Sequence, residues 1–197
     1  MRLVLLGAPG SGKGTQAAML KGELGVPHIS TGDLLRAAVR AATPLGLKAR
    51  AVMEAGQLVS DEIVLGMLED RLAEADMQRG FILDGYPRNL AQCEALEKLL
   101  ARIGQPIDVA VKIKVASELI VERLAGRAAA QGRNDDGPET VRERLRVYAE
   151  QTAPVAEHFR ELGKLVIVDG VGGVEEVFRR ILAALPTDQA GAHRLSA

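Results

Sequence analysis

A glycine-rich loop that directly follows a short apolar run limits the folds open to this chain more than any other feature. Residues 2–6 read RLVLL and residues 7–13 read GAPGSGK, which fits the pattern G-x-x-x-x-G-K. Glycines let the backbone turn so that several N–H groups point at one anion, and the helix that follows aims its positive end there. Composition alone would produce about 0.08 such matches. The pattern therefore predicts a phosphate-binding loop between a buried strand and a helix.

The residue after the lysine departs from the general pattern. A serine or threonine usually stands there and binds magnesium through its hydroxyl. Here Gly14 follows Lys13, and Thr15 comes one position later. This departure argues against a small GTPase and against most motor-type ATPases. Lys13 still places a positive charge near the outer phosphates of a nucleotide.

The rest of the chain alternates short apolar runs with amphipathic stretches. The apolar runs predict buried strands at 2–6, 27–30, 80–84, 107–115 and 164–168. Helical spacing predicts helices at 15–24, 33–42, 45–55, 60–75, 89–102, from 117 onward, at 138–162 and at 174–185. A breaker-rich polar stretch spans 126–137, and 187–197 is expected to be a frayed tail. Strands that alternate with helices indicate an α/β protein whose parallel sheet is covered on both faces.

Composition excludes several classes of protein. The 25 basic and 26 acidic residues leave a net charge of −1, so no general attraction to nucleic acid or acidic membranes is expected. The one cysteine, Cys93, excludes a disulfide framework and zinc sites built on two or more cysteines, and His28, His158 and His193 lack ligand spacing. The N-terminal apolar run is too short for a secretion signal, and no run is long enough to cross a bilayer. We expect a soluble, cytoplasmic protein.

Four sequence blocks together are similar to one family of P-loop enzymes. They are GAPGSGKGTQ at 7–16, STGDLLR at 30–36, DGYPR at 84–88 with Gln92 behind it, and RNDD at 133–136 ahead of a helix that carries Arg144. In this order, and over nearly the whole chain, they resemble the adenylate kinases and their nucleoside-monophosphate kinase relatives. The resemblance implies reversible phosphoryl transfer between ATP and AMP, giving two ADP, with Mg²⁺ bound together with ATP.

The resemblance also implies a division of the chain. A P-loop NTPase-type core with a five-stranded parallel sheet and helices on both faces would take residues 1–29, 60–125 and 137–197. A small helical insert at 30–59 would bind the monophosphate, and residues 126–136 would form a short lid. Many bacterial members have a longer lid, some with a four-cysteine zinc site. The short stretch here resembles the short-lid type, so we expect no zinc. Nothing in the sequence indicates an obligate interface, and we therefore expect a monomer.

Roles for individual residues follow from the same resemblance. For ATP it implies Gly10, Ser11, Gly12, Lys13, Gly14, Thr15, Arg127 and Gly172. For AMP it implies Thr31, Arg36, Gln57, Leu58, Val59, Gly85, Tyr86, Pro87, Arg88, Gln92, Arg133 and Arg144. Catalysis would rest on Lys13, Arg88, Arg123, Arg133 and Arg144. Asp84 would orient magnesium-bound water, and no protein group would bind the metal directly. The set suits the chemistry, because the attacking phosphate oxygen is already ionised and needs no general base.

Thr31 and Gln92 bear on the choice of acceptor. UMP/CMP kinases also have short lids, but they usually carry Ala and Asn at these two positions. An amide and a hydroxyl can meet the donor and acceptor groups of adenine, so we expect AMP to be preferred over CMP, UMP and GMP by at least about tenfold in kcat/KM.

Two further interpretations are a protein without catalysis and a different kind of P-loop kinase. A regulatory nucleotide-binding module would lack catalysis, and the six family arginines argue against it. Small P-loop kinases of sugars or shikimate would lack the block from DGYPR to Gln92.

For four residues near the motifs, an ordinary structural role is an alternative to a functional one. Met53 and Val59 could line the AMP adenine or could simply pack in the interior. Asp135 could pair with a lid arginine or could be an ordinary turn residue. Cys93 follows Gln92 within a predicted helix, and we expect its thiol to be inert.

Overall fold

The computed structural model describes residues 1–131 and 137–186, with the backbone alone described for 127–131. Within these ranges five strands form one sheet: β1 (Arg2–Leu6), β2 (His28–Ser30), β3 (Phe81–Asp84), β4 (Val109–Lys114) and β5 (Leu165–Asp169). Their order is β2-β3-β1-β4-β5, and every neighbouring pair is parallel. The predicted α/β class and the predicted five-stranded parallel sheet are therefore confirmed.

Strand β1 lies at the middle of the sheet, where the chain reverses its direction of winding. Leu5 pairs with Asp84 of β3 on one side and with Val111 of β4 on the other. Open parallel sheets bind ligands beyond the carboxyl ends of their strands at such a switch point. Because the glycine-rich loop directly follows β1, the topology places it at this position.

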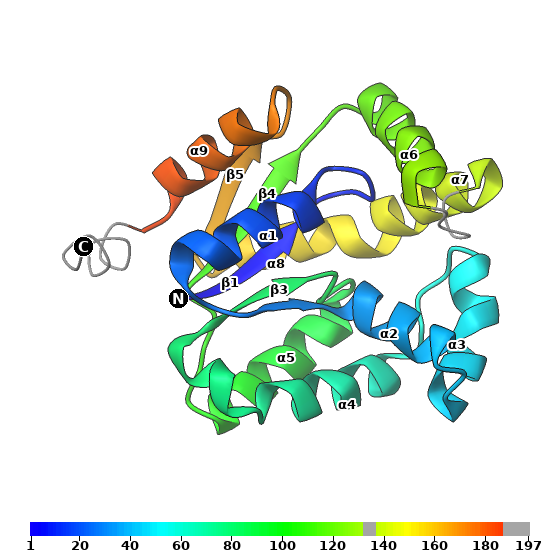
Figure 1. The fold of residues 1–197 in the computed structure, drawn as a ribbon. Helices are drawn as coiled ribbons and strands as arrows, with labels where there is room; N and C mark the ends of the chain where they lie inside the picture. Colours follow the sequence, from blue (N-terminus) through cyan, green and yellow to red (C-terminus); the bar gives the residue numbers. More distant parts are fainter. Residues whose placement is uncertain (132–136, 187–197) are drawn as a thin grey trace.

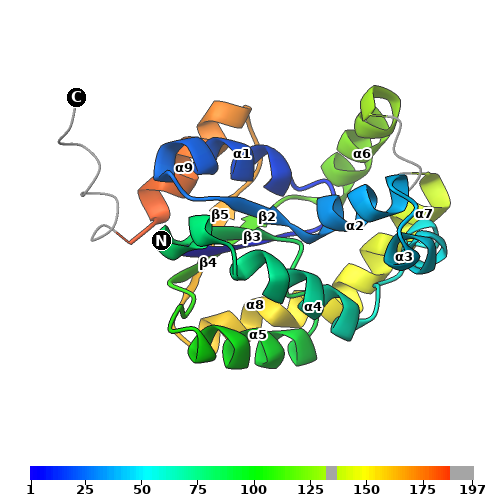
Figure 2. The ribbon, with the colours of Figure 1, turned by 60° about the horizontal axis from the view of Figure 1, so that its bottom comes forward.

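Helices cover both faces of the sheet (Figures 1 and 2). Helices α1 (Lys13–Leu24) and α9 (Val174–Ala184) lie on one face, and α4 (Asp61–Leu72), α5 (Leu90–Arg102) and α8 (Ala153–Glu161) lie on the other. The side chains of β1 alternate between the two layers. Leu3 and Leu5 join the cluster with α1 and α9, whereas Val4 and Leu6 join the cluster with α4, α5 and α8. Each such burial contributes about 1.5–3 kcal/mol, which explains why the strand is apolar at every one of these positions.

The predicted insert at 30–59 contains two helices, α2 (Thr31–Arg40) and α3 (Pro44–Glu54), which stand beside the layered core in Figure 1. Helix α2 begins two residues before its predicted start because Ser30 caps it. The Ser30 Oγ accepts a hydrogen bond from the Asp33 N–H at 3.2 Å. The cap brings Thr31 directly behind β2, at the carboxyl end of the sheet.

Helix α6 (Ser117–Gln131) differs from the sequence prediction. It runs through Gly126, where a polar, breaker-rich stretch was predicted to begin. That boundary was wrong, since one internal glycine costs a helix only about 1 kcal/mol and the alanines that follow favour it. The rest of the predicted lid, 132–136, lies outside the described residues, and so do Arg133 and Asp135.

The helix predicted at 138–162 is interrupted. It consists of α7 (Pro138–Val147), one π-helical segment, η3 (Tyr148–Thr152), and α8. Pro154 has no N–H to donate to the carbonyl four residues earlier, so the regular hydrogen-bond ladder cannot continue through it. The Thr152 hydroxyl at this irregular segment donates to the Arg88 carbonyl at 2.8 Å. The interruption therefore contacts the loop that carries a predicted site residue.

The remaining connections are short. A 3-10 segment that was not predicted, η1 (Ala75–Arg79), leads into β3, and the Phe81 N–H donates to the Met1 carbonyl at 3.0 Å. The C-terminal strand β5 leads through a turn into α9. None of the helices within the described ranges has the length and apolar character needed to cross a membrane.

Candidate active site

The loop after β1 has the backbone that its glycines predict. Gly7, Gly10 and Gly12 have φ angles of 148°, 81° and 96°, which side chains rarely adopt. A Cβ on Gly7 would lie 2.6 Å from the Ser11 Oγ, and a Cβ on Gly10 would lie 2.8 Å from the Leu124 Cγ. The Ser11 Oγ is buried with no hydrogen-bond partner among the described residues. An oxyanion in this loop would give that hydroxyl an acceptor.

Helix α1 starts at Lys13, two residues before its predicted start, so its N-terminal amides face the loop. Its first turn contains no acidic side chain to offset the positive end of the helix. The Lys13 Nζ donates to the Gly7 carbonyl at 2.7 Å and to the Ala8 carbonyl at 3.0 Å. These contacts hold the ammonium against the loop. Positive charge is therefore concentrated where the phosphates of a nucleotide would bind.

Asp84 ends β3 and faces the start of α1. A Cβ on Gly14 would lie 3.7 Å from the Asp84 Oδ2, and the His28 Nε2 lies 3.6 Å from the same oxygen. Burial raises the pKa of Asp84, but His28, Lys13 and Arg88 together outweigh burial and hold that pKa below its ordinary value. The carboxylate is therefore ionised at neutral pH beside the phosphate loop. This position and charge fit a group that orients the water of a magnesium ion.

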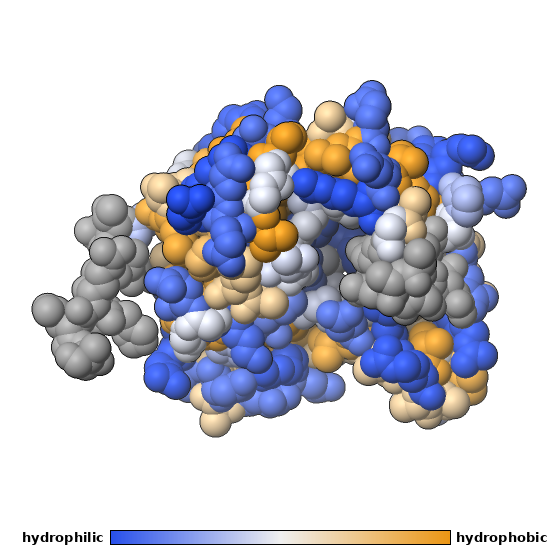
Figure 3. All heavy atoms as spheres, turned by 45° about the horizontal axis from the view of Figure 1, so that its top comes forward, coloured by the Kyte–Doolittle hydropathy of each residue, from blue (hydrophilic) through white to orange (hydrophobic). Residues whose placement is uncertain are grey.

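A cleft of about 860 Å³ extends from the phosphate loop, and arginines from four separate parts of the chain line it. These are Arg36 of α2, Arg88 of the loop after β3, Arg123 of α6 and Arg144 of α7. Figure 3 shows a hollow near the middle of one face of the molecule, with many hydrophilic side chains around it. Four guanidinium groups around one cleft suit a ligand with several negative charges.

Two of these arginines are held by neighbours in sequence, Arg88 within its loop and Arg36 within α2. The Arg88 Nε donates to the Gly85 carbonyl at 2.7 Å, and an Arg36 guanidinium nitrogen lies 2.6 Å from the Asp33 carboxylate. The positive φ of Gly85, 83°, turns the chain so that Arg88 can fold back on it. The local sequence thus orients both side chains before any ligand binds.

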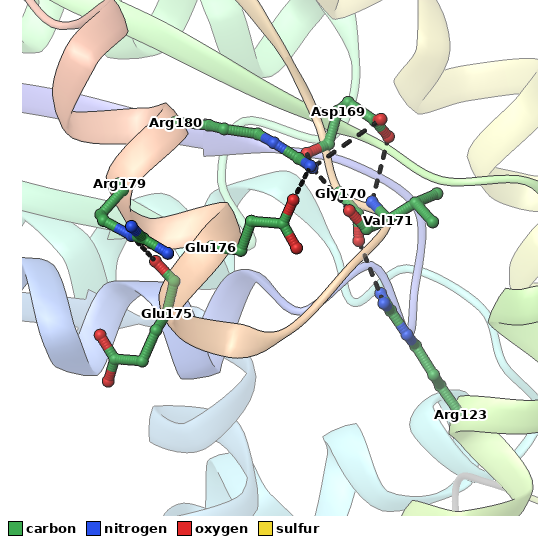
Figure 4. A network of polar contacts seen from close by, with 8 residues as sticks. All are labelled: Arg123, Asp169, Gly170, Val171, Glu175, Glu176, Arg179 and Arg180. Atoms are coloured by element: carbon green, nitrogen blue, oxygen red, sulfur yellow. Dashed lines mark hydrogen bonds and ion pairs between the residues drawn. The ribbon is translucent and has the colours of Figure 1, made fainter.

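Arg123 is tied to the turn between β5 and α9 (Figure 4). Its guanidinium donates to the Gly170 carbonyl at 3.0 Å. Arg180 of α9 holds the same turn by donating to the carbonyls of Asp169 at 3.0 Å and Val171 at 2.5 Å. Gly172 belongs to this turn, has a φ of 123° and lines the cleft. Helix α6 and the turn therefore meet at the part of the cleft that Gly172 lines, and Gly172 is one of the residues that the resemblance implies for ATP.

A small side pocket of about 60 Å³ adjoins the cleft, and Gly85, Arg88 and Arg144 line both spaces. Thr31 lies in its wall, 3% exposed, and its hydroxyl donates to the Gly85 carbonyl at 2.8 Å. A Cβ on Gly85 would lie 2.9 Å from that hydroxyl oxygen. The Thr31 oxygen keeps its capacity to accept, but its proton is engaged with Gly85.

Gln92 lines the same pocket and is 2% exposed. Its Oε1 accepts from the Arg88 backbone N–H at 2.6 Å, and its Nε2 donates to the Asp61 Oδ1 at 2.7 Å. The cap of α5 holds the residue from behind, because the Asn89 Oδ1 accepts from the Gln92 N–H at 2.8 Å. The Gln92 amide is therefore fixed at both ends beside the pocket.

The end of the 30–59 insert touches α7. The Gln57 amide donates to the Glu143 carboxylate, and the Thr140 hydroxyl donates to the Glu54 carbonyl at 3.0 Å. The Arg146 guanidinium, on the next turn of α7, holds the pKa of Glu143 below its ordinary value. Gln57 borders the side pocket, but its amide points to a carboxylate of α7.

Most predicted site residues come together in these two spaces. Those that line the cleft or the side pocket are Gly10, Ser11, Gly12, Lys13, Gly14, Thr15, Thr31, Arg36, Gln57, Leu58, Val59, Asp84, Gly85, Pro87, Arg88, Gln92, Arg123, Arg144 and Gly172. Tyr86 differs, because its ring packs in the core at 1% exposure and lines neither space. Its large apolar ring is buried among helices, so its side chain is not placed to contact AMP. The Arg127 side chain and Arg133 lie outside what the structure describes.

Three residues that support the site were missed. In the sequence, Asp61 and Asn89 stand at the starts of two predicted helices, 60–75 and 89–102, and Thr152 lies inside a third, 138–162. The sequence shows that Asp61 and Asn89 begin helices, but it contains no sign that both would meet Gln92. Met53 agrees with one of its two interpretations, and Cys93 agrees with the expectation that its thiol is inert. Met53 lines the side pocket, and burial raises the pKa of Cys93 to about 12, which keeps its thiol protonated.

Comparison with known proteins gives one consistent result. A family model described as adenylate kinase matches residues 5–164. An adenylate kinase of Xanthomonas campestris pv. campestris (strain 8004) is 65% identical over 185 residues, which cover 94% of this chain and 99% of that protein. Adenylate kinases of Xanthomonas euvesicatoria pv. vesicatoria (strain 85-10) and Stenotrophomonas maltophilia (strain R551-3) are 64% and 62% identical over the same shares.

Proposed function

Because the chain belongs to the adenylate kinase family and transfers a phosphoryl group between ATP and AMP, we propose that the phosphate loop holds the donor ATP and that the side pocket around Thr31 and Gln92 holds the acceptor AMP. One observation supports this assignment above all others. A single cleft joins a loop built for oxyanions to a pocket walled by a buried hydroxyl and a buried amide. Arg88 and Arg144 line both spaces and so stand between the two proposed nucleotides.

The proposed mechanism is in-line transfer between two phosphates. The attacking oxygen of AMP is ionised at neutral pH, so the enzyme needs to bring two polyanions together and to neutralise the transferred group. Arg36 and Arg88 would hold the AMP phosphate. Lys13 would exchange the carbonyl groups that it now contacts for the outer phosphates of ATP. Arg123 and Arg127 would bracket ATP from the lid side, and Arg133 and Arg144 would close over the transferring group.

Magnesium would bind together with ATP, and it would supply positive charge between the phosphates and orient them. Asp84 fits as the group that holds its water, since its carboxylate is ionised and lies beside Gly14 and Lys13. The absence of a side chain at Gly14 leaves room between Asp84 and the start of α1. We propose that no protein group binds the ion directly and that the enzyme carries no zinc.

The proposed division of labour makes residues 30–59 and 126–136 the parts that close over the substrates. Closure would exclude water that otherwise hydrolyses ATP. A bisubstrate analogue, two adenosines joined through phosphates, tests this. Hydrogen exchange should slow in both segments when it binds, whereas unchanged exchange in both would contradict the assignment of ATP and AMP to one closing cleft.

We further propose a cytoplasmic monomer whose partners are ATP, AMP and ADP rather than nucleic acid or membranes. The near-neutral net charge and the single buried cysteine agree with this. Light scattering after size exclusion should give the mass of one chain, and a mass of two chains would overturn the monomer.

A further inference from the structure

Asp61 begins α4 and points back toward the start of α5 rather than into the cleft. Its carboxylate accepts from the Gln92 Nε2 at 2.7 Å and from the Asn89 Nδ2 at 3.1 and 3.2 Å. It lines neither the cleft nor the side pocket. Asp61 therefore acts on any ligand only through the amides that it holds.

The chemistry of these contacts fixes which way the Gln92 amide faces. An ionised carboxylate can only accept hydrogen bonds, so the group next to Asp61 must be the NH2 of Gln92. The oxygen is then at the other end, where the Arg88 N–H donates to it at 2.6 Å. A flipped amide would set oxygen against carboxylate and NH2 against N–H. Of the two contacts, the one to a charged group is the stronger, roughly by a factor of two.

In this orientation one proton of Nε2 and one lone pair of Oε1 are still unused by Asp61 and Arg88. Adenine offers an amino donor beside a ring-nitrogen acceptor, and these match the unused acceptor and donor of the amide. Guanine offers a carbonyl and a ring N–H, so it requires the opposite orientation. The amide of glutamine alone does not discriminate between the two bases, because a free amide can turn over.

We infer that Asp61 is the positioning residue that makes Gln92 select adenine over guanine in the acceptor nucleotide. This inference rests on the proposed function, in which Gln92 contacts the base of AMP. Asp61 provides discrimination by opposing the orientation that guanine needs. Asn89 ties the carboxylate in place, so that Asp61 does not turn with the amide.

The substitution Asp61→Asn tests this inference, since an amide can either accept from Gln92 or donate to it. The ratio of kcat/KM for GMP to that for AMP should rise by about tenfold, because one of the two groups that oppose the flipped amide is neutralised. The KM for ATP should not change. Asp61→Glu retains a carboxylate and should keep the ratio within about threefold of the parent.

Glu62→Gln is the matched control. Glu62 is the exposed neighbour of Asp61 in the first turn of α4, so its loss has the same effect on the helix dipole without touching Gln92. A general loosening of the site would lower the use of AMP and GMP together and leave their ratio unchanged. Circular dichroism checks folding, and Asp61→Ser, whose hydroxyl also accepts or donates, takes the place of Asp61→Asn if that variant does not fold.

The outcomes separate this inference from the proposed function. If the parent prefers AMP, and the GMP:AMP ratio of kcat/KM rises in Asp61→Asn but not in Glu62→Gln, the result supports both the inference and the proposed function. A parent that prefers AMP, with an unchanged ratio in a folded Asp61→Asn or Asp61→Ser protein, overturns the role of Asp61 and leaves the proposed function standing. A parent that uses CMP or UMP as well as AMP overturns the role of Gln92, and the inference fails with it.

Discussion

The two ends of the cleft are built by different means. At the phosphate loop the groups proposed to contact the ligand are backbone N–H groups, and three glycines with positive φ hold them in place at the switch point of the sheet. At the side pocket they are the side chains of Thr31 from α2 and Gln92 from α5, which Gly85 and Asp61 hold. One end therefore depends on backbone shape, and the other depends on a hydrogen-bond network between elements distant in sequence.

This difference determines how each end should respond to substitution. A glycine replaced in the loop strains the backbone and displaces several donors at once. A polar side chain removed from the pocket leaves one or two buried partners without a bond, at about 1–3 kcal/mol each. Changes in the loop should therefore abolish the reaction, while changes in the pocket should alter which acceptor is used.

The largest effect is expected for Lys13→Met. Its ammonium is held by the loop carbonyls and would serve the charge of the transferring group, so kcat should fall by about 10²–10³ while the fold is retained. A coupled assay and circular dichroism measure the two quantities. Near-normal turnover in a folded variant would remove the assignment of the loop to ATP.

At the other end, Gln92→Ala should lower kcat/KM for AMP by about 10–100-fold and leave ATP binding nearly unchanged. The variant leaves the Arg88 N–H and the Asp61 carboxylate without their buried partner. Titration of an ATP analogue provides the comparison. An equal loss of ATP binding would mean that the two ends are not independent.

Substitutions at two glycines of the loop distinguish the effect of a steric clash from the effect of backbone strain. Gly7→Ala should lower the free energy of unfolding by about 2–5 kcal/mol, because its Cβ would meet both the Ser11 Oγ and the Ile113 carbonyl. Gly12→Ala should cost only about 1–2 kcal/mol, since nothing lies within 4 Å of its Cβ and only the φ of 96° is strained. Urea unfolding measures both, and equal losses would contradict the steric argument.

The charge of Asp84 predicts a dependence on pH. Its pKa is lower in the folded protein than its usual 3.8, so it stabilises the fold above about pH 4 and this contribution is lost as the pH falls through the lowered value. The stability difference between the parent and Asp84→Asn should therefore be full at pH 7 and shrink below pH 4. Unfolding midpoints across this range check it, and a difference that grows on acidification would reverse the sign.

The smallest effect is expected for Gln57→Ala. Its amide contacts Glu143 of α7 rather than the side pocket, and that carboxylate is partly exposed to water. Since exposed contacts contribute at most about 1 kcal/mol, kcat/KM for AMP should change by less than about fivefold. A loss of kcat/KM for AMP as large as that of Gln92→Ala would show that Gln57 takes part in recognising the base.

The same contrast between the two ends explains what the sequence could predict. The loop is contiguous, so residues 7–15 indicated its backbone, its helix and its place after a buried strand. The parallel sheet and its two helical layers followed from the alternation of elements, whereas the strand order is known from the structure alone. Gln92 and Thr31 were identified through their blocks, but their hydrogen bonds were not, because Asp61 reaches Gln92 only through the packing of α4 against α5.

The predicted helix boundaries were wrong where local helix preferences and tertiary contacts compete. Gly126 was expected to end a helix, yet α6 continues to Gln131 because good helix formers follow it. The interruption at Tyr148–Thr152 depends on Pro154 and on a contact with the Arg88 carbonyl, and no pattern in the sequence shows that contact. Tyr86 lies inside a site motif, but its ring packs in the core.

The acceptor panel tests the central claim most directly: kcat/KM for AMP, GMP, CMP and UMP, with ATP as donor, in one coupled assay. The claim is that the buried amide and hydroxyl of the side pocket select adenine while the loop binds phosphates regardless of the acceptor base. AMP should exceed each of the other three by at least about tenfold. A rate with CMP or UMP equal to that with AMP would contradict the account and indicate a pyrimidine nucleotide acceptor.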